Sequence, residues 1–150
     1  MKYNVLGNTG LLVSELCLGT MTFGGKGFWK VVGTQTQQDA DRLVGISLDN
    51  GINFFDTSNN YSEGLSEQIL GNALKNSNAR PDNTVIATKV RIRVGSGVNH
   101  VGLSRAHIYD SVEASLRRLQ LGHIDLLYLH GVDMYTPLEE TMRGLEDVVR

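Results

Sequence analysis

Short apolar runs alternate with stretches of helical periodicity along the whole chain. Runs typical of buried strands cover residues 16–20, 52–56, 85–89 and 124–130. Patterns typical of amphipathic helices begin at residues 36, 65, 104 and 136. The turn-forming residues Gly7, Asn8 and Gly10 separate two short apolar segments near the N-terminus, which predicts a β-hairpin. We therefore expect a hairpin followed by four β/α units.

Polar residues and glycines predict where three of the helices begin or stop. Thr36 and Asp39 have the spacing of a capping box at the start of the first helix. Ser104 is the expected cap of the third helix, and Gly122 is its expected stop. The segment TPLE at 136–139 has the pattern of a further capping box, with proline in the first helical position. It predicts that the fourth helix opens there.

The alternation of strands and helices predicts a parallel sheet. Parallel sheets are covered by helices on both faces or close into a barrel. A small doubly wound sheet and half of a (β/α)8 TIM barrel are therefore both candidates, and periodicity alone does not choose between them. A length of 150 residues suits a single domain. We expect that domain to span 1–150, with the hairpin in 1–15 and the β/α units in 16–150.

Charge and composition narrow the classes of partner. The net charge is −2 and the sequence pI is near 6.0. No run of Lys and Arg is dense enough to follow a phosphate backbone, so we expect no nucleic acid partner. No stretch approaches the roughly 20 apolar residues of a membrane-spanning helix, and the first residues lack the apolar core of a signal peptide. We expect a soluble, cytoplasmic protein without a membrane partner.

The cysteine and the histidines show no pattern of a disulfide or a metal site. The chain has one cysteine, Cys17, which cannot form an internal disulfide and which agrees with a reducing compartment. Because Cys17 lies in an apolar run, we expect a buried small side chain rather than a reactive thiol. His100, His107 and His123 lack the spacing of metal ligands, so no metal site is expected.

Four chemically capable residues fall at one predicted edge of the sheet. Asp56, Lys89 and His130 each lie at the carboxyl end of a predicted strand, and Tyr61 lies in the loop after one. Taken singly, each has an ordinary structural explanation, such as a loop cap, a surface position or a core histidine. This edge is, however, where α/β folds build their active sites. The four together therefore predict an active site.

Five segments of the chain resemble consecutive signature segments of the aldo-keto reductase family. They are LGNTGLLVSELCLGTMTFGG, GINFFDTSNNYSEGLSEQILGNAL, VIATKV, GVNHVGLSRAHI and SLRRLQLGHIDLLYLHGVDMYTPLEET, in family order and at family-like spacing. The resemblance covers essentially all 150 residues. It implies the N-terminal half of a (β/α)8 barrel and a catalytic tetrad of Asp56, Tyr61, Lys89 and His130.

The resemblance also implies a role for each member of the tetrad. Reducing a carbonyl requires a hydride at carbon and a proton at oxygen. Tyr61 would be the proton donor, and the Lys89 ammonium would stabilise its phenolate. Asp56 would hold Lys89 in place. His130 would orient the substrate oxygen or share in the proton transfer.

The cofactor implied by the resemblance is NADPH, with a small carbonyl compound as substrate. Gly19, Thr20, Met21 and Asp56 are the cofactor-binding residues that it implies in this chain. In the family, most of the groups that hold the cofactor come from the second half of the barrel, so this chain carries the proton-transfer residues without most of that cradle. Whether the cofactor is NADPH or NADH, and which carbonyl compound is reduced, both stay open.

The loop at 21–34 has two interpretations. Phe28 and Trp29 would line a substrate pocket if the family pattern holds, or they would belong to a flexible connector whose aromatic rings cover the core. In the segment after the second strand, we assign no role to Ser58 or Ser62.

Half a barrel would leave two strand edges unpaired, and unpaired edges favour association. We expect self-association, with two copies approximating a closed barrel or with another dimer that covers the edges. Three functions are compatible with the sequence. They are a reductase of aldehydes or ketones active as a homo-oligomer, a catalytically silent binding or regulatory module, and a truncated folding unit without activity. The intact tetrad favours the first, and the lacking cofactor segments favour the other two.

Overall fold

The computed structural model describes residues 1–79 and 81–150. An N-terminal hairpin is formed by β1 (Tyr3–Val5) and β2 (Leu12–Ser14), which pair antiparallel. The main sheet consists of β3 (Cys17–Gly19), β4 (Phe54–Asp56), β5 (Val85–Val90) and β6 (Leu126–Leu129). The helices are α1 (Gln37–Asp49), α2 (Leu65–Asn76), α3 (Arg105–Leu119) and α4 (Leu138–Val149), with short 3-10 turns η1 (Gly27–Val31), η2 (Tyr61–Gly64) and η3 (Pro81–Asn83).

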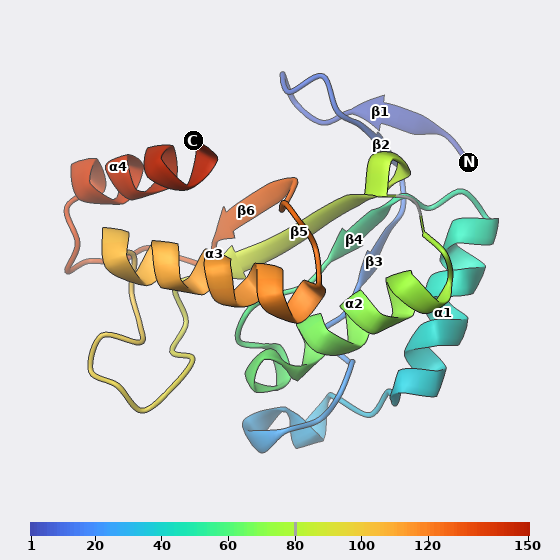
Figure 1. The fold of residues 1–150 in the computed structure, drawn as a ribbon, viewed down its shortest axis with the longest axis horizontal. Coiled ribbons are helices and arrows are strands. Elements are labelled where there is room, and N and C mark those ends of the chain that lie inside the picture. Colours follow the sequence, from blue (N-terminus) through green and yellow to red (C-terminus); the bar gives the residue numbers. More distant parts are fainter. Residues whose placement is uncertain (80) are drawn as a thin grey trace.

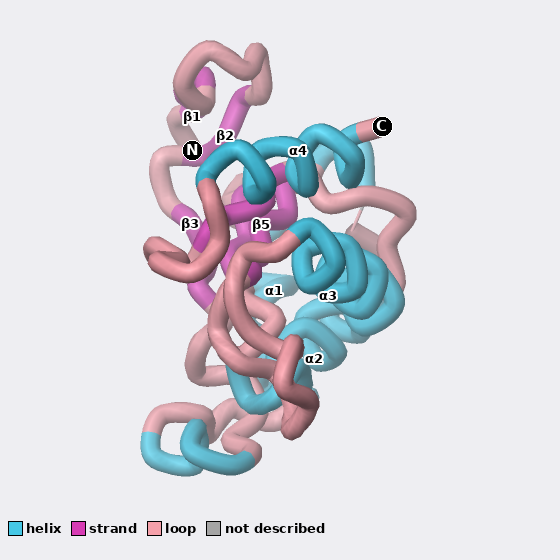
Figure 2. The backbone as a smooth tube through the Cα atoms, turned by 90° about the vertical axis from the view of Figure 1, so that its left-hand side faces the viewer, coloured by secondary structure: helices cyan, strands magenta, loops and turns pink. Residues whose placement is uncertain are grey.

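The four strands of the main sheet are parallel and lie side by side in chain order (Figure 1). Helices α1, α2 and α3 all lie on one side of this sheet (Figure 2), and α4 packs against α3. A doubly wound sheet would carry helices on both faces and would reverse its strand order. The arrangement is therefore that of half a (β/α)8 barrel, which decides between the two candidates that periodicity left open.

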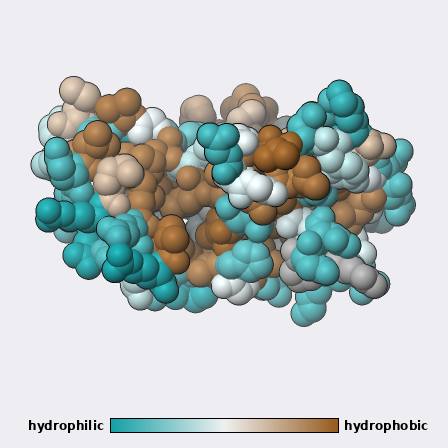
Figure 3. All heavy atoms as spheres, turned by 90° about the horizontal axis from the view of Figure 1, so that it is seen from above, coloured by the Kyte–Doolittle hydropathy of each residue, from teal (hydrophilic) through white to brown (hydrophobic). Residues whose placement is uncertain are grey.

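The core lies between the sheet and its helices. Phe55 of β4 and Ile86 of β5 are buried there against Val44 of α1 and Leu70 of α2. Because side chains alternate along a strand, the neighbouring residues point to the opposite face, where no described helix covers them. We call this the open face. Seen from above, it has hydrophobic side chains gathered along its middle (Figure 3).

The helix caps agree with the sequence at two places. The side chain of Thr36 accepts a hydrogen bond from the Asp39 amide at 3.3 Å, and Asp39 Oδ2 accepts from the Thr36 amide at 3.0 Å. The Ser104 hydroxyl accepts from the His107 amide at 3.3 Å. The predicted capping box of the first helix and the predicted cap of the third are confirmed.

Two other predictions about helix ends are wrong. The third helix ends at Leu119, and Gln120 caps it in a left-handed conformation at φ 60°, so Gly122 is not its stop. No capping box opens the fourth helix, because the Thr136 hydroxyl donates to Asp133 Oδ2 at 2.7 Å. Asp133 also accepts from the Leu103 amide at 2.7 Å, so its carboxylate organises this loop and competes for the threonine.

The expectation of a buried Cys17 is also wrong. Cys17 is exposed on the open face, while its neighbour Leu18 packs against the core. The apolar run was read correctly as a strand, but the face to which each residue points depends on the register with β4. In the described part of the chain, none of the helices has the length and apolar character needed to cross a bilayer.

Candidate active site

The site is built on an ion pair at the carboxyl ends of β4 and β5. Asp56 is the last residue of β4 and pairs in register with Ala87, so Lys89 lies one step further along the same face of β5. Lys89 Nζ donates to Asp56 Oδ2 at 2.6 Å and to the Thr57 carbonyl at 2.7 Å. The two side chains are only 14% and 27% exposed for Lys89 and Asp56 respectively. The ammonium is therefore fixed in a partly desolvated position.

Tyr61 lies directly against this ammonium. It begins η2 and is buried. Lys89 Nζ lies 3.4 Å from the Tyr61 hydroxyl oxygen and 4.9 Å from the centre of its ring. A positive charge at this position favours the phenolate that forms when a tyrosine gives up its proton. The geometry can therefore support proton donation by Tyr61.

His130 faces Tyr61 from the end of β6. Its backbone amide donates to the Val90 carbonyl at 2.8 Å, which continues the β5–β6 pairing. The ring centres of His130 and Tyr61 are 5.9 Å apart at an interplanar angle of 80°. Burial lowers the pKa of His130, and the positive charges of Lys89 and Arg91 add to the lowering against the opposing effect of Asp56. The lowered pKa favours the neutral imidazole of His130.

The structure brings all four predicted catalytic residues to one edge, and it adds contacts that the sequence reasoning missed. Ser58 Oγ lies 3.3 Å from His130 Nδ1 and donates to Asn60 Oδ1 at 2.7 Å. Ser62 Oγ donates to the Phe23 carbonyl at 2.9 Å and accepts from the Gly25 amide at 2.9 Å. Ser58 thus contacts the histidine, and Ser62 fixes the loop that follows β3. The polar residues that directly follow the buried strand ending at Asp56 were the sequence signal that could have indicated both contacts.

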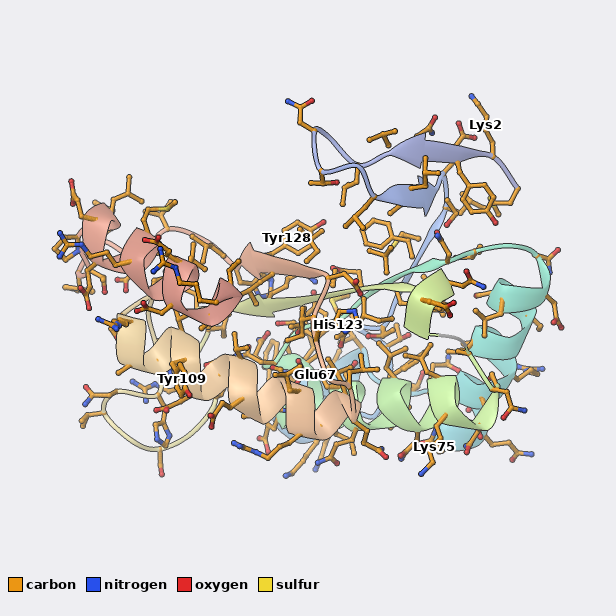
Figure 4. All side chains as sticks on the ribbon, turned by 45° about the horizontal axis from the view of Figure 1, so that its top comes forward. Lys2, Glu67, Lys75, Tyr109, His123 and Tyr128 are labelled. Atoms are coloured by element: carbon orange, nitrogen blue, oxygen red, sulfur yellow. The ribbon has the colours of Figure 1, made fainter. Side chains whose placement is uncertain are left out.

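Two residues near the tetrad could not have been found from sequence periodicity. Tyr128 of β6 pairs in register with Lys89, and its ring centre is 5.8 Å from Lys89 Nζ. Figure 4 shows Tyr128 on the open face, opposite the helices. The side chain of Asn59 is buried, and neither of its amide atoms has a hydrogen-bond partner among the described residues. The position of Tyr128 beside Lys89 and the burial of the Asn59 side chain both depend on how the strands and loops pack in the tertiary structure.

The loop residues Phe28 and Trp29 flank a cavity beside the tetrad. The Trp29 ring packs edge-on against Tyr61 with ring centres 5.0 Å apart, and Phe28 packs on Trp29 at 6.0 Å. The cavity has a volume of about 820 Å³. Its lining residues come from the loops after β3, β4 and β5, namely Lys26, Phe28, Trp29, Asn60, Glu63, Ile92, Arg93, Val94, Gly95 and Ser96. Trp29 therefore connects the cavity wall to the candidate proton donor.

The residues expected to bind the cofactor divide into two kinds. Gly19 is exposed on the open face, with no atom within 4 Å of the position a β-carbon would take, and Met21 is 44% exposed. Thr20 is fully buried, and its hydroxyl lies 3.0 Å from Ser66 Oγ and 3.1 Å from the Asp56 carbonyl. Gly19, Met21 and Asp56 can face a ligand, whereas the Thr20 side chain holds the strand ends together.

A larger cavity, of about 1030 Å³, lies at the opposite end of the sheet. It is bounded by the hairpin and by the residues that precede β4 and β6, including Asn53, His123 and Asp125. Active sites of parallel α/β folds form at the carboxyl ends of the strands, so the smaller cavity is the one that matters for the chemistry. In residues 1–79 and 81–150, no three His, Cys, Asp or Glu side chains form a group that could hold a metal ion.

Comparisons with known proteins agree with this geometry. The family model described as "Aldo/keto reductase family" matches residues 15–150. The chain is 40% identical to "Aldo-keto reductase AMT2" of Alternaria alternata, over 99% of the chain and 46% of that protein. It is 42% identical to "Uncharacterized oxidoreductase YrpG" of Bacillus subtilis, over 100% of the chain and 46% of that protein. It is also 39% identical to "Probable voltage-gated potassium channel subunit beta" of Arabidopsis thaliana, over 99% of the chain and 43% of that protein.

A solved structure gives the same result. The holo form of aldo-keto reductase AKR11C1 from Bacillus halodurans superposes with a TM-score of 0.81 at 37% identity, covering 99% of this chain and 46% of that one. The chain thus spans about half the length of the relatives it matches. The predicted hairpin with four β/α units is confirmed as a half-barrel arrangement. The chain belongs to the aldo/keto reductase family.

Proposed function

We propose that the protein reduces aldehydes or ketones to alcohols with NADPH as the reductant. One observation supports this most directly. A single ammonium, that of Lys89, contacts the carboxylate of Asp56 at 2.6 Å and the hydroxyl of Tyr61 at 3.4 Å. Such a contact is what a tyrosine needs to act as a proton donor near neutral pH.

Each residue of the tetrad has a defined task in this proposal. When bound, the reduced nicotinamide supplies the hydride that reaches the carbonyl carbon. Tyr61 gives its hydroxyl proton to the carbonyl oxygen, and Lys89 stabilises the phenolate that remains. Asp56 keeps the ammonium in place. The neutral imidazole of His130 donates from Nε2 to the substrate oxygen, which requires the Ser58 hydroxyl to turn from Asn60 and donate to His130 Nδ1.

The residues on the open face suit part of the cofactor. A flat ring can approach Gly19 closely, because among the described residues other than its chain neighbours no atom lies within 4 Å of the position that a β-carbon would take. Met21 and Asp56 flank that surface at the same strand ends. These residues would hold the nicotinamide end, next to Tyr61. NADPH is preferred to NADH in this proposal because of the family resemblance.

The assembly is part of the proposal. We infer one domain over 1–150 whose sheet has its outer edges at β3 and β6, and which associates with a second copy through those edges in a reducing, cytoplasmic compartment. Apolar side chains near β6 support this association because several are exposed. They are Tyr128, Val132, Met134, Tyr135, Leu138 and Met142.

A second candidate is a catalytically silent binding module. It is favoured by the 39% identity to a relative whose name is that of a potassium channel β subunit. The third candidate is a folding unit without activity. The silent module and the inactive folding unit both predict that no carbonyl compound is reduced.

The test is NADPH oxidation by the purified chain in the presence of a simple aldehyde, with nucleotide binding followed by fluorescence. Replacing Tyr61 by Phe should lower kcat by about 10²- to 10⁴-fold, because the proton donor is lost. Tyr109→Phe is the matched control, since Tyr109 is exposed on α3 and away from the open face (Figure 4). Turnover insensitive to Tyr61→Phe would contradict the proposal. Nucleotide binding without turnover would favour the silent module.

A further inference from the structure

One charged side chain at the rim of the site has no hydrogen-bond or ion-pair partner among the described residues. Arg91 follows β5 directly and is half-buried. No hydrogen bond or ion pair joins its guanidinium to another described residue. A partly buried guanidinium offers five N–H donors in a fixed fork and remains charged at every physiological pH. It therefore has unused capacity to bind an anion.

Arg91 lies on the same side of the rim as the tetrad. Its Cδ and Nη1 atoms are 3.5 Å from the position that a β-carbon would take at Gly131, the residue after His130. The positive charge of Arg91 helps to lower the pKa of His130, although burial and the charge of Lys89 lower it more. Its side chain is therefore near the histidine proposed to orient the substrate oxygen.

The acidic side chains at this rim already form ion pairs or hydrogen bonds. Asp56 is paired with Lys89, and Glu63 is paired with Lys26 at 3.3 Å. Asp133 accepts hydrogen bonds from its own loop and from Leu103. Asp133 is bound by neutral donors, and the Arg91 charge adds last to the lowering of its pKa, so the two attract each other but form no ion pair in the described chain.

The backbone at Arg91 is strained, which indicates that the side chain at this position has a function. Its φ is 133°, in the half of conformational space that non-glycine residues rarely occupy, and its carbonyl accepts from the Gly102 amide at 2.8 Å. A glycine would take this conformation without strain. Strained residues of this kind cluster at functional sites, where the side chain has a use.

We propose that Arg91 anchors a carboxylate on the carbonyl substrate, so that the site favours aldehydes and ketones that carry an acidic group. This inference rests on the proposed carbonyl reduction. A planar guanidinium binds a carboxylate through two parallel hydrogen bonds, which fixes orientation as well as charge. The anchored substrate would extend from Arg91 past His130 toward Tyr61.

The experiment compares 4-formylbenzoate with its methyl ester, which has the same reacting group and no charge. The unmodified chain should reduce the carboxylate with a kcat/KM at least about tenfold above that of the ester, mainly through KM. Arg91→Gly should abolish this preference, and Arg91→Lys should restore part of it. Because glycine relieves the strain at φ 133°, Arg91→Gly is expected to fold at least as well as the unmodified chain.

Two further measurements make the outcomes distinct. Binding of 4-formylbenzoate is followed by NMR chemical shifts without cofactor, so that it does not depend on turnover. Saturable binding that is lost in Arg91→Gly supports the anchor even if neither aldehyde is reduced, an outcome that would count against the reductase proposal alone. Tyr61-dependent reduction of both aldehydes without preference for the carboxylate overturns the anchor and leaves the reductase proposal intact.

Arg93 is the matched alternative, because it lies two residues further in the same loop. Its guanidinium Nη1 already donates to the Gly95 and Gly97 carbonyls at 3.1 and 2.7 Å. If Arg93→Gln rather than Arg91→Gly removes the preference, the assignment is overturned. A loss of NADPH affinity in Arg91→Gly with the preference unchanged would assign the guanidinium to the cofactor and would also overturn it.

Discussion

Charged side chains on the two faces of the parallel sheet differ in how deeply they are buried. On the face covered by helices, Glu67 is fully buried, and its carboxylate accepts from Thr88 Oγ1 at 2.6 Å and from Arg118 Nε at 2.6 Å. On the open face, Asp56 and Lys89 are paired but remain partly exposed. Figure 4 shows Glu67 on the helix side of the sheet and Tyr128 on the open side.

The helix-covered face stabilises the fold, whereas the open face keeps charged side chains accessible to a ligand. Thr88 and Lys89 are neighbours on β5, yet one binds the buried Glu67 and the other binds Asp56 at the open edge. The buried network fixes the strand from behind. The open ion pair stays within reach of a ligand, because desolvation there is only partial.

The largest expected effect separates two adjacent phenylalanines of β4. Phe55→Ala should lower the free energy of unfolding by about 4 kcal/mol, because Phe55 is fully buried in the core. Phe54→Ala should cost about 1 kcal/mol, since Phe54 points to the open face and is half-buried. Urea titration of both variants measures the difference. Equal losses at high protein concentration, but not at low concentration, would indicate that a second copy covers Phe54.

The next effect contrasts a buried ion pair with an exposed one. Glu67→Ala should lower the free energy of unfolding by about 3 kcal/mol, because Arg118 and Thr88 would lose their partner inside the protein. Glu63→Ala is the control, and it should cost less than about 1 kcal/mol because the Glu63–Lys26 pair is more than half exposed. Similar losses for the two variants in a thermal melt or urea titration would contradict the larger contribution of the buried pair.

Cys17 tests how far the open face is removed from water. Cys17 is exposed as a residue, yet partial desolvation of its thiol, together with the nearby Asp56 carboxylate, raises its pKa to about 11. Labelling by a thiol reagent at pH 7 should therefore be about a hundredfold slower than in the urea-unfolded chain, because the thiolate is the reactive form. The rate should keep rising up to pH 11. A plateau near pH 9 would show that the sulfur is fully solvated.

The smallest effect is the titration of His130. Its pKa is lowered in the folded chain, so protonation favours the unfolded chain. The stabilising contribution of neutral His130 is present above the ordinary pKa, near 6.5, and is lost as the pH falls below it. An NMR titration should place the midpoint for His130 below that of the unfolded chain, and Lys89→Met should raise it. A midpoint at or above the unfolded value would contradict the burial of the ring.

Much of the fold was predictable because it depends on local bonds and on periodicity. The capping box at Thr36 and Asp39 forms within four residues, so its sequence signature was sufficient. The strands were found from their apolar runs, although β3, β4 and β6 are shorter than predicted and β5 extends one residue further, to Val90. The positions of Asp56, Lys89 and His130 at strand ends predicted that they would meet at the carboxyl edge, and the structure brings them together there.

The sequence by itself determined the order of the elements, the family resemblance and the four residues of the tetrad. Only the tertiary structure decided which side of each strand meets the helices, because a shift of register by one residue exchanges the two faces. This is why Cys17 is exposed and why Tyr128 lies beside Lys89. A tertiary contact from the Leu103 amide holds Asp133 where it accepts from the nearby Thr136, and tertiary packing leaves the guanidinium of Arg91 without a hydrogen-bond partner in the described chain. Such bonds compete with local ones, and the spacing of residues along the chain does not record which of them wins.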